Sequence, residues 1–356
     1  MLLRENESWL CGFYQGVGDA ISVLPALKKI KEHYPKVNLV IAATASTAPI
    51  FEAAGVADRI IVFECFNSKT LFNTIRLVLC LRKYKFNRIF ISPHAFRSGW
   101  KISLFSLLIK TQKCITYGNY YDIFSWVYTY RIKVADAPIA LRELDFFAQC
   151  KIINRDKQII YPRFTFERVD EKIASLVRQC KSKDNHPLLI GIHPGAGVNI
   201  KRWSNEKVML LLKQILSLFN HSKVFLMVGP KERKEYDREF FDEQVFRELV
   251  LVHTDIISLM YLISQLDLLV CLDSGAAHIA AMFATPTVAL YGSRPPSICG
   301  PVNKNAIVLY KDDLACRGLD CYKNKCHLNT NVCMRKITVD DVIKTVKVVL
   351  SKNDCG

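Results

Sequence analysis

Several features that would place this 356-residue chain in a protein class at once are missing from it. No apolar run reaches the roughly 18 residues that a membrane span needs, because Lys or Arg interrupts each candidate. The start, MLLRENESWL, has acidic residues where a signal peptide would have an apolar core, so we predict a cytoplasmic protein. No helix-turn-helix, zinc-finger or RNA-binding signature occurs, so nucleic acid is not an expected partner.

The cysteines near the C-terminus lack the two-residue spacing of common zinc knuckles. Four, four and six residues separate Cys316, Cys321, Cys326 and Cys333, while most of the other cysteines lie singly in apolar runs, where a thiol packs as a small hydrophobe. A disulfide is not expected in a reducing cytosol. A structural metal site stays open for this group, and a reduced cluster that packs the loop is the preferred interpretation.

Charge is unevenly distributed over the chain, whose formal net charge is +16. From Asn67 to Val134, twelve Lys or Arg residues accompany a single acid, Asp122, which is an excess of +11. Such a surface attracts phosphate, so an anionic bilayer or an acidic glycolipid is favoured, with a merely solvated basic face as the alternative. Trp100 and Phe105 lie among basic residues, which favours a membrane surface over nucleic acid.

The first half of the chain alternates strand-like and helix-like apolar patterns, which predicts an α/β domain with a mostly parallel sheet over residues 1–165. The periodicity weakens and charges accumulate from Lys151 to Pro187, so we expect the interdomain linker at 166–187. One predicted helix contains Ile21, Leu24 and Leu27, with Pro25 near its first turn. The other elements are strands at Trp9–Tyr14, Asn38–Ala43, Arg59–Phe63, Arg88–Ser92 and Lys113–Tyr117, and helices at Thr47–Ala54, Thr70–Lys83, Ser98–Lys110 and Asp136–Cys150.

A second α/β set is predicted over residues 188–356, again with strands and helices in alternation. The predicted strands are Leu188–His193, Val224–Val228, Val250–His253, Leu268–Leu272 and Thr287–Tyr291. The predicted helices are Asn205–Phe219, Glu232–Arg247, Ile256–Ser264, the segment after Asp273 through Phe283, and Thr338–Leu350.

The most patterned stretch runs from Asp267 to Pro301 and reads DLLVCLDSGAAHIAAMFATPTVALYGSRPPSICGP. Its apolar strand ends at Asp273, and small residues lead into a helix that contains His278. Small residues let a ligand approach the backbone, and free N–H groups at a helix N-terminus suit an anion. Two alternatives stay open, with Asp273 as a plain helix N-cap and His278 as an ordinary core histidine.

Two further strand–turn–helix junctions look able to face a ligand. The first carries Gly16 and Gly18, with Asp19 at its tip. A dinucleotide fingerprint would need a third glycine and a later acid, so a Rossmann dehydrogenase is disfavoured. The second, Pro194–Gly197, can present backbone N–H groups to phosphate, and Lys201 can add a cation, although Lys201 taken singly is more simply a surface lysine.

Taken in order, these motifs resemble glycosyltransferase family 9, the heptosyltransferases of lipopolysaccharide core assembly. The DSG-x-x-H block followed by P-x-x-x-L-Y-G is the most specific part, and the matching segments span nearly the whole chain. These segments are GVGDAISVLPAL (16–27), GIHPGAG (191–197), KRW (201–203), MVGPKERKE (227–235), LDLLVCLDSGAAHIAAMFATPTVALYG (266–292) and CMRKIT (333–338).

The resemblance implies a GT-B fold, in which two Rossmann-like α/β domains face each other across a cleft. It also implies inverting transfer of a sugar, typically heptose from ADP-heptose, onto a membrane glycolipid such as lipid A–core. On this basis Asp19 is the catalytic base, and Lys201 balances the charge of the leaving diphosphate. Arg97 and Lys101 are expected to bind the acceptor. The expected donor contacts are Gly195, Ala196, Lys201, Glu232, Asp273, Ser274, Gly275 and His278.

No Asp-x-Asp triplet occurs, so neither a metal ion nor another cofactor is expected. The resemblance places the acceptor on the N-terminal domain and the nucleotide sugar on the C-terminal domain, with the protein peripheral at the inner face of the inner membrane. One alternative is another GT-B nucleotide-sugar enzyme, such as an epimerase, which would leave the basic stretch unexplained. The other is a non-catalytic GT-B binding module, which need not keep Asp19, Lys201, Asp273 and His278 together.

Overall fold

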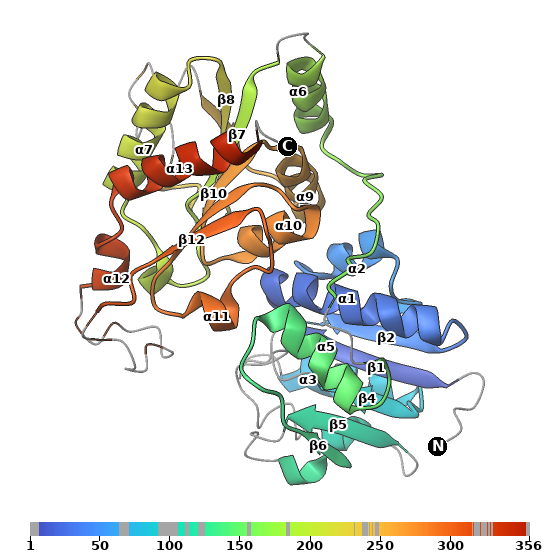
Figure 1. Ribbon diagram of the computed structural model, residues 1–356. Helices are drawn as coiled ribbons and strands as arrows, with labels where there is room; N and C mark the ends of the chain where they lie inside the picture. The colour runs from blue at the N-terminus through green and yellow to red at the C-terminus, as the bar shows by residue number, and fades with distance from the viewer. Residues whose placement is uncertain are drawn as a thin grey trace. The chain divides into compact units, whose positions relative to one another are not determined.

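The chain divides into two compact units, a first unit of residues 1–165 and a second unit of residues 166–356, and each is described by itself (Figure 1). The description rests on a computed structural model. The residues it describes are 7–63, 71–91, 106–110, 114–119, 125–154, 158–182, 186–230, 232–236, 249–314 and 330–353, with Phe241, Glu243, Val245, Cys316, Cys321, Cys326 and Leu328.

The first unit contains a six-stranded parallel sheet in the order β3-β2-β1-β4-β5-β6. This is the doubly wound order, in which the chain leaves the central strand β1 first to one side and then to the other. The strands are β1 (Ser8–Tyr14), β2 (Asn38–Ala43), β3 (Arg59–Val62), β4 (Arg88–Phe90), β5 (Ile115–Asn119) and β6 (Tyr130–Ile132). The helices are α1 (Val17–His33), α2 (Ala48–Ala54), α3 (Leu71–Arg82) and α5 (Ile139–Gln149), and Ser125–Val127 forms a 3-10 turn.

The central position of β1 follows from its sequence. Trp9, Leu10 and Cys11 are fully buried, because a strand with neighbours on both sides and helices on both faces meets no water. Helix α1 follows and packs against α5 and α2. It begins at Val17, so the buried Pro25 lies inside the helix and not near its first turn, which corrects the sequence-based expectation.

The second unit contains a second six-stranded parallel sheet, in the order β12-β11-β10-β7-β8-β9. The strands are β7 (Leu188–His193), β8 (Ser222–Met227), β9 (Leu249–Val252), β10 (Leu268–Leu272), β11 (Thr287–Tyr291) and β12 (Ala306–Tyr310). The helices are α6 (Glu171–Lys181), α7 (Asn205–Leu218), α9 (Ile256–Gln265), α10 (Gly275–Phe283), α11 (Pro296–Cys299), α12 (Val332–Arg335) and α13 (Val339–Asn353), with a 3-10 turn, η3, at Asn199–Lys201.

The range expected to be a linker contains helix α6, which packs against α9 in the second unit. Asp170 caps this helix by accepting a hydrogen bond from the Lys172 N–H at 2.8 Å. Ile173 and Val177 are buried and follow each other by one helical turn, a signal that the surrounding charges obscured.

Three further differences from the expected elements concern short or edge segments. Strands β6 and β12 lie at sheet edges and were not predicted. The helix expected from Glu232 is wrong at its start, because residues 232–236 form turns.

No helix among the described ranges is long and apolar enough to cross a membrane.

Candidate active site

The carboxyl ends of three adjacent strands in the second unit carry the loops that hold most of the predicted donor residues. From β7 the chain continues into β8 and β9 on one side, and β10 then pairs with β7 on the other side. Open α/β sheets bind ligands outside the carboxyl ends at such a reversal of strand order. The loop after β7 carries Gly195 and Lys201, the loop after β8 carries Glu232, and the loop after β10 carries Asp273.

Lys201 and Asp273 form a buried ion pair between two of these loops. Lys201 Nζ lies 2.6 Å from Asp273 Oδ2, and the two side chains are only 11% and 6% exposed. Apart from this ion pair, Oδ2 has no hydrogen-bond partner among the described residues. A buried charge requires a nearby opposite charge, and the paired, largely buried Lys201 is therefore not the surface lysine of the simpler alternative.

His278 lies on α10 within electrostatic reach of this pair. Burial lowers its pKa to about 4, while the Asp273 charge opposes this shift and the Lys201 charge adds to it. The ring is therefore neutral near pH 7. His278 is buried, as the core alternative expects, but it also responds to both charges of the ion pair.

A second group of side chains surrounds the glycine turn after β7. Glu232 is buried, and a methyl group added at Gly195 would lie 3.2 Å from its carboxyl carbon. The same methyl group would lie 3.1 Å from Cε1 of His193, the last residue of β7. Burial lowers the pKa of His193, and Glu232 opposes the shift. The structure thus joins Gly195, Glu232 and His193, with Ala196 half-buried in the same turn.

Helix α10 begins at Gly275, directly after the ion pair. Its N-cap is Ser274, so the alternative that made Asp273 the N-cap is wrong. The Ser274 side chain makes no capping bond, and its buried Oγ has no hydrogen-bond partner among the residues that the structure describes. The Ala277 N–H donates to the Ser274 carbonyl at 3.2 Å, so the N–H groups of Gly275 and Ala276 and this hydroxyl are the donors that an anion could use.

Asp19 lies in the first unit, in the first turn of α1 and not at the tip of a loop. Gly16 is the N-cap of this helix, and a methyl group added there would lie 2.8 Å from Asp19 Oδ2. The carboxylate therefore folds back over the start of the helix, where the positive end of the helix dipole favours a negative charge.

Two predicted groups of residues remain to be placed. Arg97 and Lys101, the expected acceptor contacts, lie outside the described residues. The C-terminal cysteines are free thiols, and no group of three or more potential metal ligands occurs within the described ranges. Cys333 instead belongs to the hydrophobic core of the second unit.

Comparisons with known proteins assign the chain to a family. The sequence profile of Glycosyltransferase family 9 (heptosyltransferase) matches residues 74–329, more than half of the chain. The chain belongs to glycosyltransferase family 9.

Individual family 9 members are similar over nearly their whole length. Lipooligosaccharide heptosyltransferase 2 of Campylobacter jejuni is 24% identical over 337 residues, which cover 93% of this chain and 95% of that protein. A crystal structure of a glycosyl transferase family 9 protein from Veillonella parvula covers 98% of this chain and 99% of its own, with a TM-score of 0.74 and 20% identity. The Escherichia coli ADP-heptose lps heptosyltransferase II structure has the same two coverages, a TM-score of 0.73 and 19% identity.

These comparisons confirm the predicted GT-B fold and a glycosyltransferase activity, and they do not favour the epimerase or the binding module. His193 is the site residue that the sequence analysis did not select. Its signal was present, since it is the polar residue that ends a buried strand at the carboxyl edge of the sheet.

Proposed function

We propose that this family 9 enzyme transfers heptose from ADP-heptose to a lipopolysaccharide core or a related glycolipid, with inversion at the anomeric carbon. The names of its relatives support the sugar and the acceptor class. The observation that carries the proposal is the Lys201–Asp273 pair with His278 at the N-terminus of α10. It combines a cation, free backbone donors and a carboxylate, as a sugar diphosphate requires.

Each donor contact then has a role. The Lys201 ammonium and the first-turn N–H groups at Gly275 stabilise the charge that collects on the leaving diphosphate. Asp273 accepts hydrogen bonds from sugar hydroxyls, and neutral His278 lies within its electrostatic reach. Glu232 accepts hydrogen bonds from the ribose hydroxyls. Because positive groups of the chain already face the diphosphate, we propose that the reaction needs no metal ion.

Asp19 is the proposed catalytic base. The acceptor hydroxyl oxygen bonds to the anomeric carbon, its proton passes to the Asp19 carboxylate, and the bond to ADP breaks with its electron pair on the diphosphate oxygen. A single positioned carboxylate is sufficient for such a displacement.

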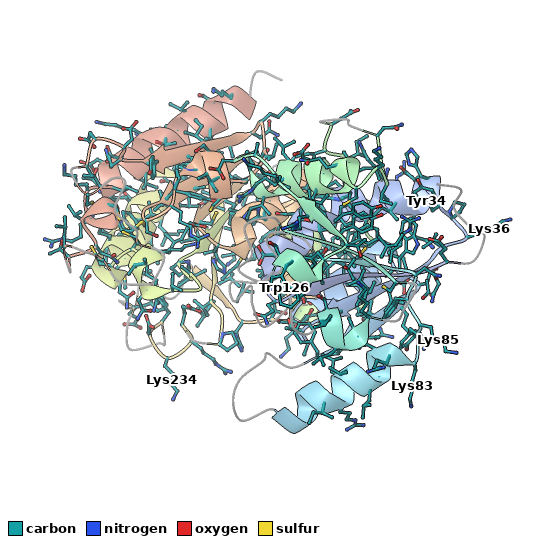
Figure 2. The ribbon with its side chains drawn as sticks, turned by 90° about the horizontal axis from the view of Figure 1, so that it is seen from below. Tyr34, Lys36, Lys83, Lys85, Trp126 and Lys234 are labelled. Carbon is teal, nitrogen blue, oxygen red and sulfur yellow. The ribbon has the colours of Figure 1, made fainter. Side chains whose placement is uncertain are left out.

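We further propose that the first unit binds the inner face of the inner membrane through the outer face of α3. Ile75 and Leu79 follow each other by one turn and are more than half exposed. Arg76 and Lys83 are exposed on the same side, and residues 71–91 contain no acid. Figure 2 shows Lys83 and Lys85 at the outer side of this unit, where α3 ends.

This face continues onto a second helical segment at residues 106–109. Arg82 Nη1–H donates to the Leu108 carbonyl at 3.4 Å, which places the segment beside the end of α3. Leu107 and Leu108 are nearly half exposed. Exposed leucines among cations are typical of a surface that enters the interface of an anionic bilayer.

The transfer activity is tested with the purified protein, a panel of nucleotide sugars and defined lipid A–core acceptors, with products identified by mass spectrometry. We expect the acceptor to gain the mass of one heptose when ADP-heptose is the donor, and no mass from the other nucleotide sugars. Asp19→Asn should abolish transfer and keep the ADP affinity measured by calorimetry. Lys201→Ala should weaken both transfer and ADP affinity. Glu52→Gln on α2 is the control. Transfer of another sugar, or equal loss of ADP binding in both site variants, would contradict the proposal.

Membrane contact is tested by co-sedimentation with vesicles of phosphatidylethanolamine, with and without phosphatidylglycerol. The Leu79→Ser variant should bind the anionic vesicles more weakly than the wild type, whereas Leu210→Ser, at an exposed leucine on α7, should not. Arg76→Gln should weaken binding about fivefold at low salt. Equal binding by all four proteins would exclude this face.

A further inference from the structure

A cavity of about 360 Å³ lies in the second unit, beside the N-terminus of α7. Its lining comes from the segment between β7 and α7, the start of α7, the loop after β8 and the segment that contains α12. The residues proposed to bind the donor are not part of this lining. Small-molecule sites occupy roughly 300–1,000 Å³, so the cavity has the size of a site for a small ligand.

Three cations and one acid contribute to the lining, namely Arg202, Lys207, Arg335 and Glu235. Arg202 and Glu235 form a bidentate pair, in which Nη1–H donates to Oε1 at 2.7 Å and Nη2–H donates to Oε2 at 2.6 Å. The charge of Glu235 is thereby balanced within the protein. Lys207 and Arg335 therefore give the cavity an excess of positive charge.

Two hydrogen bonds fix the Lys207 ammonium beside Arg335. The Nζ–H groups donate to the Arg335 carbonyl at 2.6 Å and to the Ile337 carbonyl at 2.7 Å. An ammonium has three N–H groups, so one remains for a ligand. The Arg335 side chain is exposed, and its guanidinium makes no hydrogen bond or ion pair to another residue that the structure describes.

The positive charges of Lys207 and Arg335 repel each other. Burial lowers the pKa of Lys207, and the Arg335 charge lowers it further. Asp341 opposes this shift, but its carboxylate already pairs with Lys311 Nζ at 3.1 Å. Glu206, in the first turn of α7, is exposed and is not part of the cavity lining. An anion that binds between the two cations would relieve their repulsion.

A phosphate monoester matches this lining better than other anions. It carries roughly −1.5 to −2 charges at pH 7, enough to balance both cations, whereas a carboxylate balances only one. Asn199 and Asn205 add amide groups, which can bind sugar hydroxyls. The Trp203 ring is 5% exposed and lies 5.5 Å from Lys207 Nζ, so it offers no open face on which a nucleotide base could stack.

We propose that this cavity binds a sugar phosphate, with the phosphate on Lys207 and Arg335 and the sugar hydroxyls on Asn199 and Asn205. The site is distinct from the donor site, and the inference does not rest on the proposed transfer reaction. Soluble sugar phosphates and phosphorylated glycolipids both carry the required group, and the experiments below separate these two sources.

Calorimetry of the full chain with glucose 6-phosphate tests the site. Arg335→Gln should bind this ligand about tenfold more weakly than the wild type, the factor expected for one lost charge-assisted hydrogen bond. Because Arg335 is exposed, the variant should keep the wild-type Tm without ligand. Glucose, which lacks the phosphate, should not bind. Equal affinity of wild type and Arg335→Gln for glucose 6-phosphate, or equally tight binding of glucose, would overturn the proposal.

Lys336→Gln is the matched control. It removes the same charge from the next residue, which is also exposed but does not line the cavity, so it should bind glucose 6-phosphate like the wild type. Lys201→Ala separates the cavity from the donor site, since it should lose ADP affinity and keep its affinity for glucose 6-phosphate. If Lys201→Ala loses glucose 6-phosphate and Arg335→Gln keeps it, the phosphate binds at the donor site and the cavity proposal is wrong.

Co-sedimentation with phosphatidylethanolamine vesicles that contain lipid A, whose sugars carry phosphate, identifies the source. Weaker sedimentation of Arg335→Gln than of Lys336→Gln would support a glycolipid phosphate as the ligand. Equal sedimentation of the two variants, with the expected difference in their affinity for glucose 6-phosphate, would support a soluble sugar phosphate. Equal behaviour of the two variants in both assays would exclude the site.

Discussion

The buried Lys201–Asp273 pair gives the sharpest quantitative prediction. Lys201→Met keeps the length of the side chain and removes its charge, which leaves Asp273 buried without its counter-charge. Breaking a buried pair in this way costs roughly 3–5 kcal/mol. Because Lys201 is 11% exposed and some water can reach the site, we expect about 3 kcal/mol at neutral pH. For a cooperative unit of the size of residues 166–356, that lowers Tm by about 6–12 °C.

A double-mutant cycle isolates the pair from other effects of the substitution. Lys201→Met with Asp273→Asn removes both charges together, so the double variant should be closer to the wild type than Lys201→Met alone, with a coupling of about 2 kcal/mol. Scanning calorimetry of the full chain gives the four Tm values, and ADP binding should still be lost in the double variant. Additive effects of the two substitutions, or a Tm loss below about 1 °C for Lys201→Met, would refute the reasoning.

The remaining predictions concern neighbouring parts of the second unit. The pKa of His278 is about 4 in the folded protein and 6.5 in the unfolded chain, so protonation favours unfolding. Its contribution to the free energy of unfolding is therefore complete above pH 6.5 and is lost as the pH falls toward 4, a loss on the order of 3 kcal/mol. Urea titrations between these pH values should show that loss, and His278→Asn should flatten it. Gly195→Ala should weaken ADP binding several-fold in calorimetry, because its methyl group crowds Glu232 and His193, while Gly197→Ala, with no atom within 4 Å of the new methyl, should bind ADP normally. Trp203→Phe loses the hydrogen bond from Nε1–H to the Ile337 carbonyl at 3.1 Å, so the free energy of unfolding measured in urea should fall by about 1 kcal/mol. Unchanged stability would mean that this bond does not hold the C-terminal segment.

Local sequence determined most of the elements. Buried strands such as Leu188–His193 and Thr287–Tyr291 are continuous apolar runs closed by turn residues, so their ends coincide with the prediction. Helix α6 was missed although Ile173 and Val177 mark its buried face, because its many charges suggested a linker. The edge strand β12 was missed although Ala306–Tyr310 is a continuous apolar run, AIVLY.

The sequence also pointed to Asp19, Lys201, Asp273 and His278 as candidate site residues, because each lies in a quoted motif that follows a predicted strand. It could not show that Lys201 and Asp273 touch, because 72 residues separate them and only the strand order brings their loops together. Chemistry that depends on side chains of distant segments is decided by tertiary packing, whereas chain order and local pattern are sufficient for the elements themselves.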